Sequence, residues 1–180
     1  ILNNEISEND RGILLVGSTT MGNRIVDNNI SNNGGVTVPD GGVCFIDWPY
    51  DNMICHNNFL CNTNQARVSG SKMNTWDDGF PSGGNYWSDY TARYPSAKEL
   101  DASGIWDTQY VIDSNNMDRF PLMNPYVDPK PWDVTGPVMW VPDGKCDIRD
   151  IALVALFYGS VVGDGRYDSR ADLTGITYLV

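Results

Sequence analysis

The sequence has little positive charge, a single histidine and no long apolar run. Its 12 Lys and Arg face 23 Asp and Glu, for a formal net charge of -11, so the phosphates of nucleic acid would repel it. No run of about 18 apolar residues predicts a membrane span, and no basic-then-apolar leader is seen. Ile1 is not Met and already lies inside a repeat. We therefore expect a mature or truncated piece of a longer protein, for which a missing leader does not argue against secretion.

Cysteine spacings typical of metal sites are also missing. No C-x-x-C pair occurs among the four cysteines, which are Cys44, Cys55, Cys61 and Cys146. Cys55 and Cys61 are close enough in sequence to be a candidate disulfide. The alternative is that most of the four cysteines are small buried hydrophobic residues. His56 shares a repeat column with Asn3 and Asp27. This column predicts an outward-facing histidine that is by itself a poor general base or copper ligand.

The sequence does contain a repeated pattern of asparagines and large apolar residues. The unit from Asn23 to Asn33 reads N-x-I-x-x-N-x-I-x-x-N, and close copies run from Ile1 to Asn9 and from Asn52 to Asn62. The copies superimpose after shifts of 24 and 29 residues. A repeat this short, with single apolar residues between Asn and Gly turns, is unsuited to helical hairpins and predicts coils of a β-solenoid.

Each coil is expected to point its large apolar residues into a shared core, because no coil can bury its apolar face alone. Two internal stacks are predicted: Ile1, Ile25 and Ile54, and Ile6, Ile30 and Phe59. The asparagines are expected to turn the corners with left-handed backbone angles and to stack their amides; loop composition without a ladder and ligand-binding amides are the alternatives. The prediction is an all-β, right-handed parallel β-helix of about three coils over residues 1 to about 76, with a fourth coil beginning at Asn74.

Binding could reside in a loop or in exposed aromatic residues. The middle coil is longer than its predecessor, and its extra residues fall near Gly34 to Gly41; solenoid insertions are commonly extruded on one face and often bind ligands. Flat aromatic faces suit pyranose rings. The candidate sugar-binding residues are Trp48, Tyr50, Trp76, Tyr86, Trp87, Tyr90 and Trp106. Their alternative role is the core of a lid.

The segment from Trp76 to about Tyr126 is rich in aromatic residues and turns, and a solenoid needs its last coil covered. Three runs carry a resemblance: N-T-W-D-D-G-F-P-S-G-G-N-Y-W-S-D-Y from Asn74, D-T-Q-Y-V-I-D from Asp107 and D-R-F-P-L-M from Asp118. They resemble the C-terminal end of archaeal right-handed parallel β-helix surface proteins, described as carbohydrate-binding or periplasmic copper-binding repeats. The resemblance implies an aromatic cap and an extracellular or cell-surface location. Relatives carry an Asp-Gly-rich turn that could hold a cation where this chain has residues 91–105.

A Pro-rich linker at residues 127–131 is expected to separate the β-helix domain, residues 1–126, from a tail domain, residues 132–180. If Pro137 to Pro142 is looped out, the tail reads as a calcium loop, with oxygen ligands at the first, third, fifth and twelfth positions and a carbonyl at the seventh. The predicted Ca²⁺ ligands are Asp133, Thr135, Asp143, the Lys145 carbonyl and Asp150. An Asp-rich helix N-terminus is the alternative.

The calcium loop has a partial second copy, because Asp172 to Gly175 repeats Asp133 to Gly136. The pair resembles a type I dockerin-like module of archaeal surface proteins, in which each duplicated loop precedes a helix. That resemblance implies a small α-helical module with a helix from Ile148 to Tyr158, whose second half is incomplete because the second loop lacks its Asp-Gly and its helix.

Three function classes follow: a structural surface protein, a carbohydrate-binding module, and a polysaccharide lyase or hydrolase. The candidate carboxylates, Asp77 with Asp78 and Asp89 near Arg93, fit turn and cap roles better than catalysis, so we expect no enzyme. We expect a structural or adhesive surface protein that self-associates through its β-helix ends and calcium-stabilised tail into a head-to-tail fibre, with polysaccharide binding as the alternative. Asn29 begins an N-glycosylation acceptor pattern.

Overall fold

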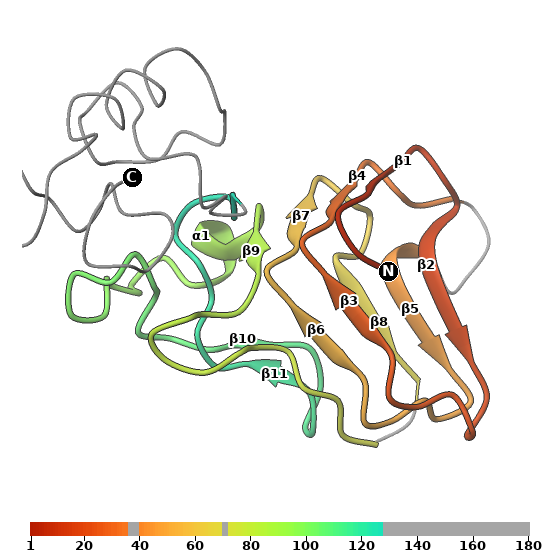
Figure 1. Ribbon diagram of the computed structural model, residues 1–180. Coiled ribbons are helices and arrows are strands. Elements are labelled where there is room, and N and C mark those ends of the chain that lie inside the picture. Colours follow the sequence, from red (N-terminus) through yellow and green to blue (C-terminus); the bar gives the residue numbers. More distant parts are fainter. Residues whose placement is uncertain (36–39, 70–71, 128–180) are drawn as a thin grey trace, which may run out of the picture. The chain divides into compact units, whose positions relative to one another are not determined.

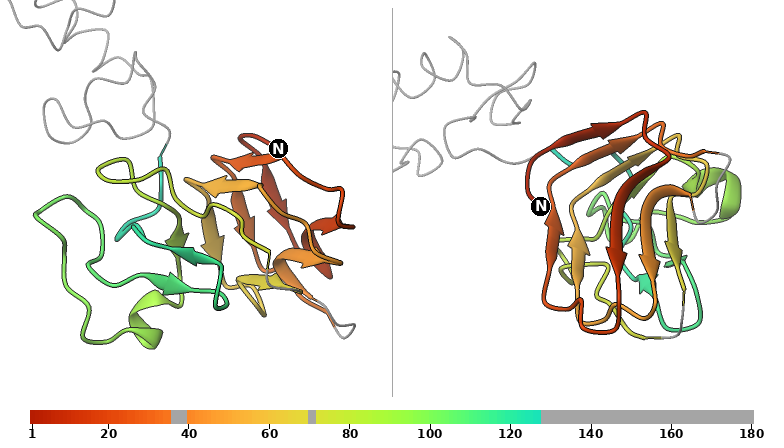
Figure 2. Two further views of the ribbon diagram at one scale, coloured as in Figure 1. Left: turned by 90° about the horizontal axis from the view of Figure 1, so that it is seen from below. Right: turned by 90° about the vertical axis from the view of Figure 1, so that its right-hand side faces the viewer.

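A computed structural model describes residues 1–35, 40–69 and 72–127. In these ranges the chain winds through three parallel sheets, one strand per coil (Figure 1). Sheet A holds β3 (Arg24–Val26) and β6 (Met53–Cys55). Sheet B holds β1 (Glu5–Ser7), β4 (Asn29–Ser31), β7 (Asn58–Leu60) and β9 (Tyr86–Trp87), and sheet C holds β2 (Arg11–Val16), β5 (Gly41–Ile46) and β8 (Ala66–Val68). The coils stack one behind another (Figure 2), so the all-β prediction of stacked parallel coils is confirmed.

The strand register is the one that the repeat predicts. Ile30 pairs with Ile6 on one side and with Phe59 on the other, and Ile25 pairs with Ile54. Ile25, Ile30, Ile54 and Phe59 are fully buried, whereas Ile1 is 56% exposed. Because side chains alternate across a strand, this register sends the repeated apolar residues of the second and third coils into the same core. The prediction that Ile1 also lies inside this stack is wrong.

Three ladders of asparagine side chains run along the coils. In the central one, the backbone N–H and Nδ2 of Asn28 both donate to Oδ1 of Asn57, at 3.1 and 2.8 Å, and Asn57 repeats this to Asn85. The ladders are Asn23–Asn52–Asn74–Asn116, Asn4–Asn28–Asn57–Asn85–Asp118 and Asn9–Asn33–Asn62. The amides of Asn28, Asn52 and Asn57 therefore find a partner in the segment that follows along the ladder, as buried polar groups require. The predicted ladder is confirmed.

The backbone of the corners differs from the prediction. The ladder asparagines do not have positive φ; the residue before each of the first three central-ladder asparagines does, at Asn3 (54°), Asp27 (58°) and His56 (57°). The ladder asparagine must direct its amide inward to the next coil, so the preceding residue makes the left-handed turn. Asn and Asp tolerate that conformation better than most residues.

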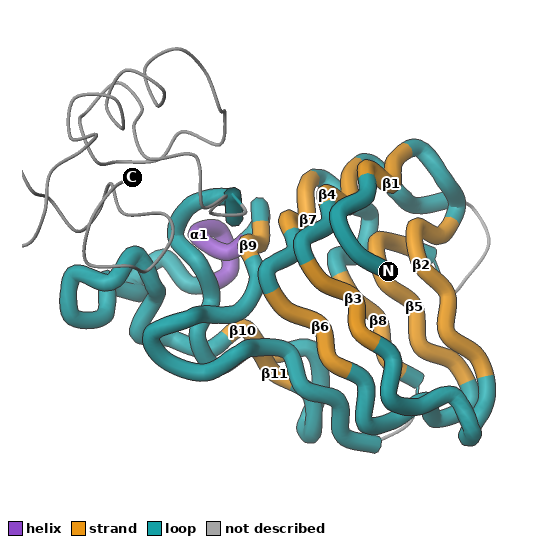
Figure 3. The backbone as a smooth tube through the Cα atoms, in the orientation of Figure 1, coloured by secondary structure: helices purple, strands orange, loops and turns teal. Residues whose placement is uncertain are grey.

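The predicted lid is confirmed and is held by aromatic stacking. Trp87 in β9 stacks on Phe59 of the third coil, with centroids 4.4 Å apart, and Tyr110 stacks on the other face of Trp87 at 4.0 Å. Tyr110 belongs to an antiparallel hairpin of β10 (Tyr110–Val111) and β11 (Met117–Asp118), which follows the short helix α1 (Tyr90–Arg93). Long loops connect these elements (Figure 3).

The hairpin also ends two ladders. Asn116 accepts from Asn74 and from the indole N–H of Trp76, and Asp118 accepts from Asn85 and from the indole of Trp87 at 2.9 Å. Residues Ile1–Tyr126 form one compact unit. The dockerin-like module and the linker beyond Val127 lie outside the described residues, as does the middle of the predicted loop at residues 34–41.

Candidate functional site

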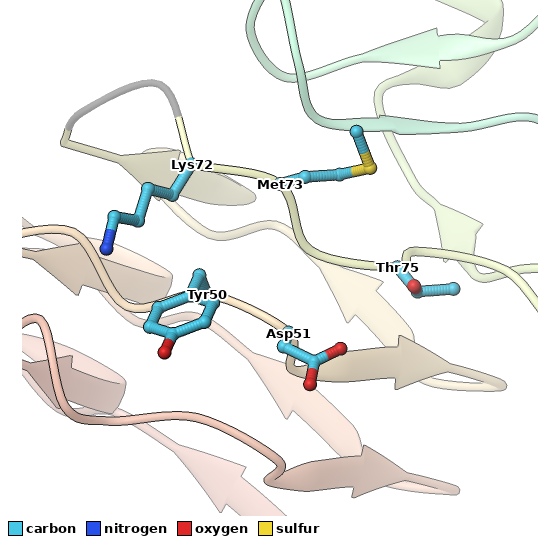
Figure 4. A pocket seen from close by; sticks show the side chains of 5 residues that line it. All are labelled: Tyr50, Asp51, Lys72, Met73 and Thr75. Atoms are coloured by element: carbon cyan, nitrogen blue, oxygen red, sulfur yellow. The ribbon is translucent and has the colours of Figure 1, made fainter.

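The described residues form a groove of about 540 Å³ at the corner where the chain passes from sheet C to sheet A. It is lined by Tyr50, Asp51, Lys72, Met73 and Thr75 (Figure 4). Its lining residues come from successive coils. A hydrogen bond from the backbone N–H of Asp51 to the carbonyl of Met73, at 2.9 Å, holds the two corner segments side by side. The stacking of coils thus brings together side chains about one repeat apart in sequence.

The groove combines an aromatic ring with groups of both charges. The Lys72 ammonium lies 4.2 Å from the centroid of the Tyr50 ring, a cation–π contact. The Asp51 carboxylate and the Thr75 side chain are exposed nearby. This set can stack on an apolar face and can both donate and accept hydrogen bonds, which is what a ligand rich in hydroxyl groups requires.

The corner segments that build the groove also carry exposed apolar side chains. Met21 pairs with Tyr50 and is 51% exposed, and Met73 is 71% exposed. Trp48 is 55% exposed and has a φ of 64°, directly after Asp47 at 59°. Left-handed conformations are unfavourable for bulky residues and cluster at ligand-binding sites. Trp48 is therefore exposed to solvent in a backbone conformation that is unfavourable for a bulky residue.

The predicted aromatic candidates divide into two groups. Trp76, Trp87 and Tyr90 are at most 2% exposed and pack in the lid core, so the prediction that they bind sugar is wrong. Their flat faces are covered by other rings, because the last coil had to be closed. Tyr86 is half-buried in β9, and Trp106 stacks on Tyr90 at 5.0 Å. Trp48 and Tyr50 remain accessible at the corner.

Sequence reasoning missed the groove residues of the third coil. Lys72 follows Tyr50 at the same interval, 22 residues, that separates the ladder asparagines Asn52 and Asn74. The repeat register could therefore have placed Lys72 beside Tyr50.

The paired carboxylates proposed as catalytic candidates have structural partners. Asp77 is 2% exposed and is held by Arg119 through two side-chain hydrogen bonds, at 2.9 and 2.7 Å. Burial would raise the pKa of Asp77, but the hydrogen bonds and charge of Arg119 outweigh it and hold that pKa below its usual value. Asp78 accepts from Ser82, and Asp89 accepts from Tyr110. These contacts fasten the lid.

The potential metal ligands are dispersed or enclosed. His56 Nε2 lies 3.2 Å from both the carbonyl and Oγ of Ser82, and its ring stacks on Tyr126. Burial raises the pKa of the Cys55 thiol to about 12 and also raises that of Cys44. Cys55 is buried in β6 and Cys61 is exposed, and both are free, so the candidate disulfide is wrong. Nowhere in residues 1–35, 40–69 and 72–127 do three His, Cys, Asp or Glu side chains come together as a metal group.

Two further predicted sites have different outcomes. Asn29 is exposed on β4, where its Oδ1 accepts from Asn58 at 2.7 Å. The calcium ligands between Asp133 and Asp150 lie outside the described residues. No helix in the described part of the chain is long and apolar enough to cross a membrane.

Comparison with known proteins gives one match. Residues 1–92 match the model of a family described as "Periplasmic copper-binding protein (NosD)". No curated protein and no solved structure shows significant similarity. The match supports a β-helix protein of the periplasm or cell surface, and it does not reach residues 132–180, for which a dockerin-like module is predicted.

This family overturns the prediction of calcium as the cofactor, because its description points to copper, and the described residues hold no calcium site. Copper favours imidazole, thiolate and thioether ligands. Among the described residues no three His, Cys, Asp or Glu side chains come together to hold a metal ion, His56 is the only histidine of the chain, and burial raises the pKa of the Cys44 and Cys55 thiols. The matched residues 1–92 nevertheless span more than half of the 180 residues, so the chain belongs to the periplasmic copper-binding protein (NosD) family.

Proposed function

We propose that this β-helix protein is a non-enzymatic adhesive scaffold of the periplasm or cell surface, which binds neutral polysaccharide at the corner groove. The observation that carries the proposal is a groove that holds Tyr50, Lys72 and Asp51, with the exposed Trp48 two residues before Tyr50 in the same corner segment. The asparagine ladders fix the coils and so pre-organise the groove, which reduces the entropy lost on binding.

Charge favours a neutral ligand over an acidic one. The chain has a net charge of -11, and Asp47 and Asp51 lie in the corner segment between β5 and β6, so a polyanionic glycan would be repelled over a long range. A neutral sugar can place its apolar face on Trp48 or Tyr50. Its hydroxyl groups can accept from Lys72 and donate to Asp51.

The lid disfavours head-to-tail assembly into a fibre. A fibre built by stacking coil on coil needs a bare last coil with open strand edges. The lid covers that coil: Trp87 stacks on Phe59, and Tyr110 stacks on Trp87.

Glycan-array screening followed by calorimetry of the full chain tests the proposal. Binding to a neutral polysaccharide is expected to weaken about tenfold or more in Trp48→Ala and in Tyr50→Ala, because each removes a stacking face. Phe80→Ala is the matched control, since Phe80 is an aromatic residue of similar exposure, 49%, in the lid. Equal binding by all three variants, or binding only to acidic glycans, would contradict the proposal.

A further inference from the structure

The outer face of the third coil holds the end of the compact unit by a specific set of contacts. Asn58 in β7 accepts from the backbone N–H of Tyr126 at 2.6 Å and donates from Nδ2 to the carbonyl of the same residue at 2.9 Å. The Tyr126 ring stacks on His56, with centroids 4.3 Å apart and ring planes 3° from parallel. We call His56 and Asn58 the clamp.

The clamp contacts the backbone and the aromatic ring of a single residue. A side-chain amide that satisfies both the N–H and the C=O of one residue replaces the pairing that a neighbouring strand would give to an extended segment. The histidine ring adds a platform for an aromatic side chain. The chemistry of the clamp therefore suits an extended segment that carries an aromatic residue.

The second coil provides an internal comparison. The positions equivalent to His56 and Asn58 are Asp27 and Asn29, because β4 and β7 pair in register. An aspartate offers no ring for stacking, and Asn29 remains exposed, whereas Asn58 is 7% exposed beneath Tyr126. This difference between the second and third coils indicates that the ring of His56 makes the outer face of the third coil a binding site for an aromatic side chain.

The occupant lies where it can be exchanged. Tyr126 is the last residue of the compact unit Ile1–Tyr126, and Val127 is 54% exposed. The contacts with the clamp join residues 68 apart in sequence. The same two hydrogen bonds and the same stack can form with the corresponding segment of another molecule, as in domain exchange. Within one chain the high effective concentration favours the chain's own Tyr126.

We infer that His56 and Asn58 form a binding site for an extended aromatic segment, and that it takes Asn124–Val127 of a second copy when its own segment is displaced. Copies held side by side on a surface would then be linked through this site. The inference is independent of the corner groove and of its sugar.

Mixing two full-length variants tests this inference. Tyr126→Ala leaves an open clamp without a competing ring, and the double variant His56→Asn with Asn58→Ala leaves a released Tyr126 without a clamp. Asparagine is chosen at position 56 because it tolerates the positive φ found there. Light scattering after size exclusion is expected to show monomers for each variant alone and a 1:1 complex for the mixture.

The controls separate this site from other contacts. Adding Tyr126→Ala to the double variant is expected to abolish the complex, and pairing Tyr126→Ala with a Phe80→Ala protein, whose clamp and Tyr126 are both intact, is expected to give about tenfold less complex. A mixture that remains monomeric, with both variants folded by circular dichroism, would overturn the inference. A complex that survives removal of Tyr126 from both partners would also overturn it.

Discussion

The coils and the lid enclose one core by different means. In the coils, parallel strands repeat the same pairs, so that Ile30 meets Ile6 and Phe59 in one register and each ladder asparagine meets another asparagine. In the lid, almost every contact occurs once, as between Asp77 and Arg119 or between Trp87 and Tyr110. A repeated contact is supported by its neighbours on both sides. A contact that occurs once has no such support, and the lid depends on large rings and charged pairs instead.

The largest effect is expected from placing a charge in the repeated core. Ile30→Asp puts an unpaired carboxylate at a fully buried position, which costs at least several kcal/mol and should unfold the coils. Circular dichroism melting would check this. Leu14→Asp, on the exposed outer face of β2, is the control and should melt within a few degrees of the wild type. A folded Ile30→Asp protein with a normal Tm would refute the inward assignment.

The next effect concerns a ladder position in the coils. Asn57→Asp keeps the acceptor for Asn28 but loses the donor to Asn85, and it aims a carboxylate at the carbonyl of Ile25. We expect a loss of about 3–5 kcal/mol in the free energy of unfolding, measured by urea titration. Asn29→Asp makes the same chemical change on the exposed face and should cost less than about 1 kcal/mol. Equal losses in the two variants would mean that the ladder adds no stability.

A pH-dependent effect is expected where the ladder enters the lid. Burial raises the pKa of Asp118 to about 7, although the hydrogen bonds from Asn85, Trp87 and Phe120 act to lower it. The folded state therefore binds this proton more tightly than the unfolded state, whose aspartate has a pKa of about 3.9. The contribution of Asp118 to stability should fall as pH rises from about 4 toward about 7.

Denaturant titrations over this pH range would isolate the Asp118 contribution. The stability of wild type relative to Asp118→Asn should decline with rising pH, because asparagine does not titrate. Parallel pH profiles for the two proteins would show that the carboxyl group has an ordinary pKa.

The smallest effect is expected at the exposed edge of the lid. Arg93 lies 3.9 Å from Asp89, with both side chains more than a third exposed, and it also donates to the carbonyl of Val111. Arg93→Ala should lower stability by about 1 kcal/mol or less, because solvent screens such pairs. Thermal melting at low and high salt would check this. A loss as large as that of Asn57→Asp would show that the lid depends on this edge as much as the coils depend on their ladders.

The repeat made the coils predictable and left the lid largely unpredictable. Equal spacing fixes which apolar residues share a stack, because the strand register follows from it. The repeat predicts the left-handed residue at Asn4, Asn28 and Asn57, one position later than the structure has it, since backbone angles at a turn do not follow from composition. The contacts of Asn58 with Tyr126 and of Asp77 with Arg119 join residues 68 and 42 apart, and pairs that occur once leave no periodic signal. For the same reason the sequence left open whether Trp76 and Trp87 bind sugar or form the core of the lid.

The ladders have a direction. In each one the backbone N–H and the amide of an asparagine donate to the oxygen of the coil that comes later in the chain. As the chain leaves the ribosome, a finished coil therefore presents a row of donors, and the next coil supplies the acceptors as it emerges. Growth in this manner proceeds from first coil to last, in the order of synthesis. Asp118 accepts from Asn85 and has no side-chain amide to donate to a further coil. The central ladder therefore ends at Asp118, and no further coil is needed to complete it.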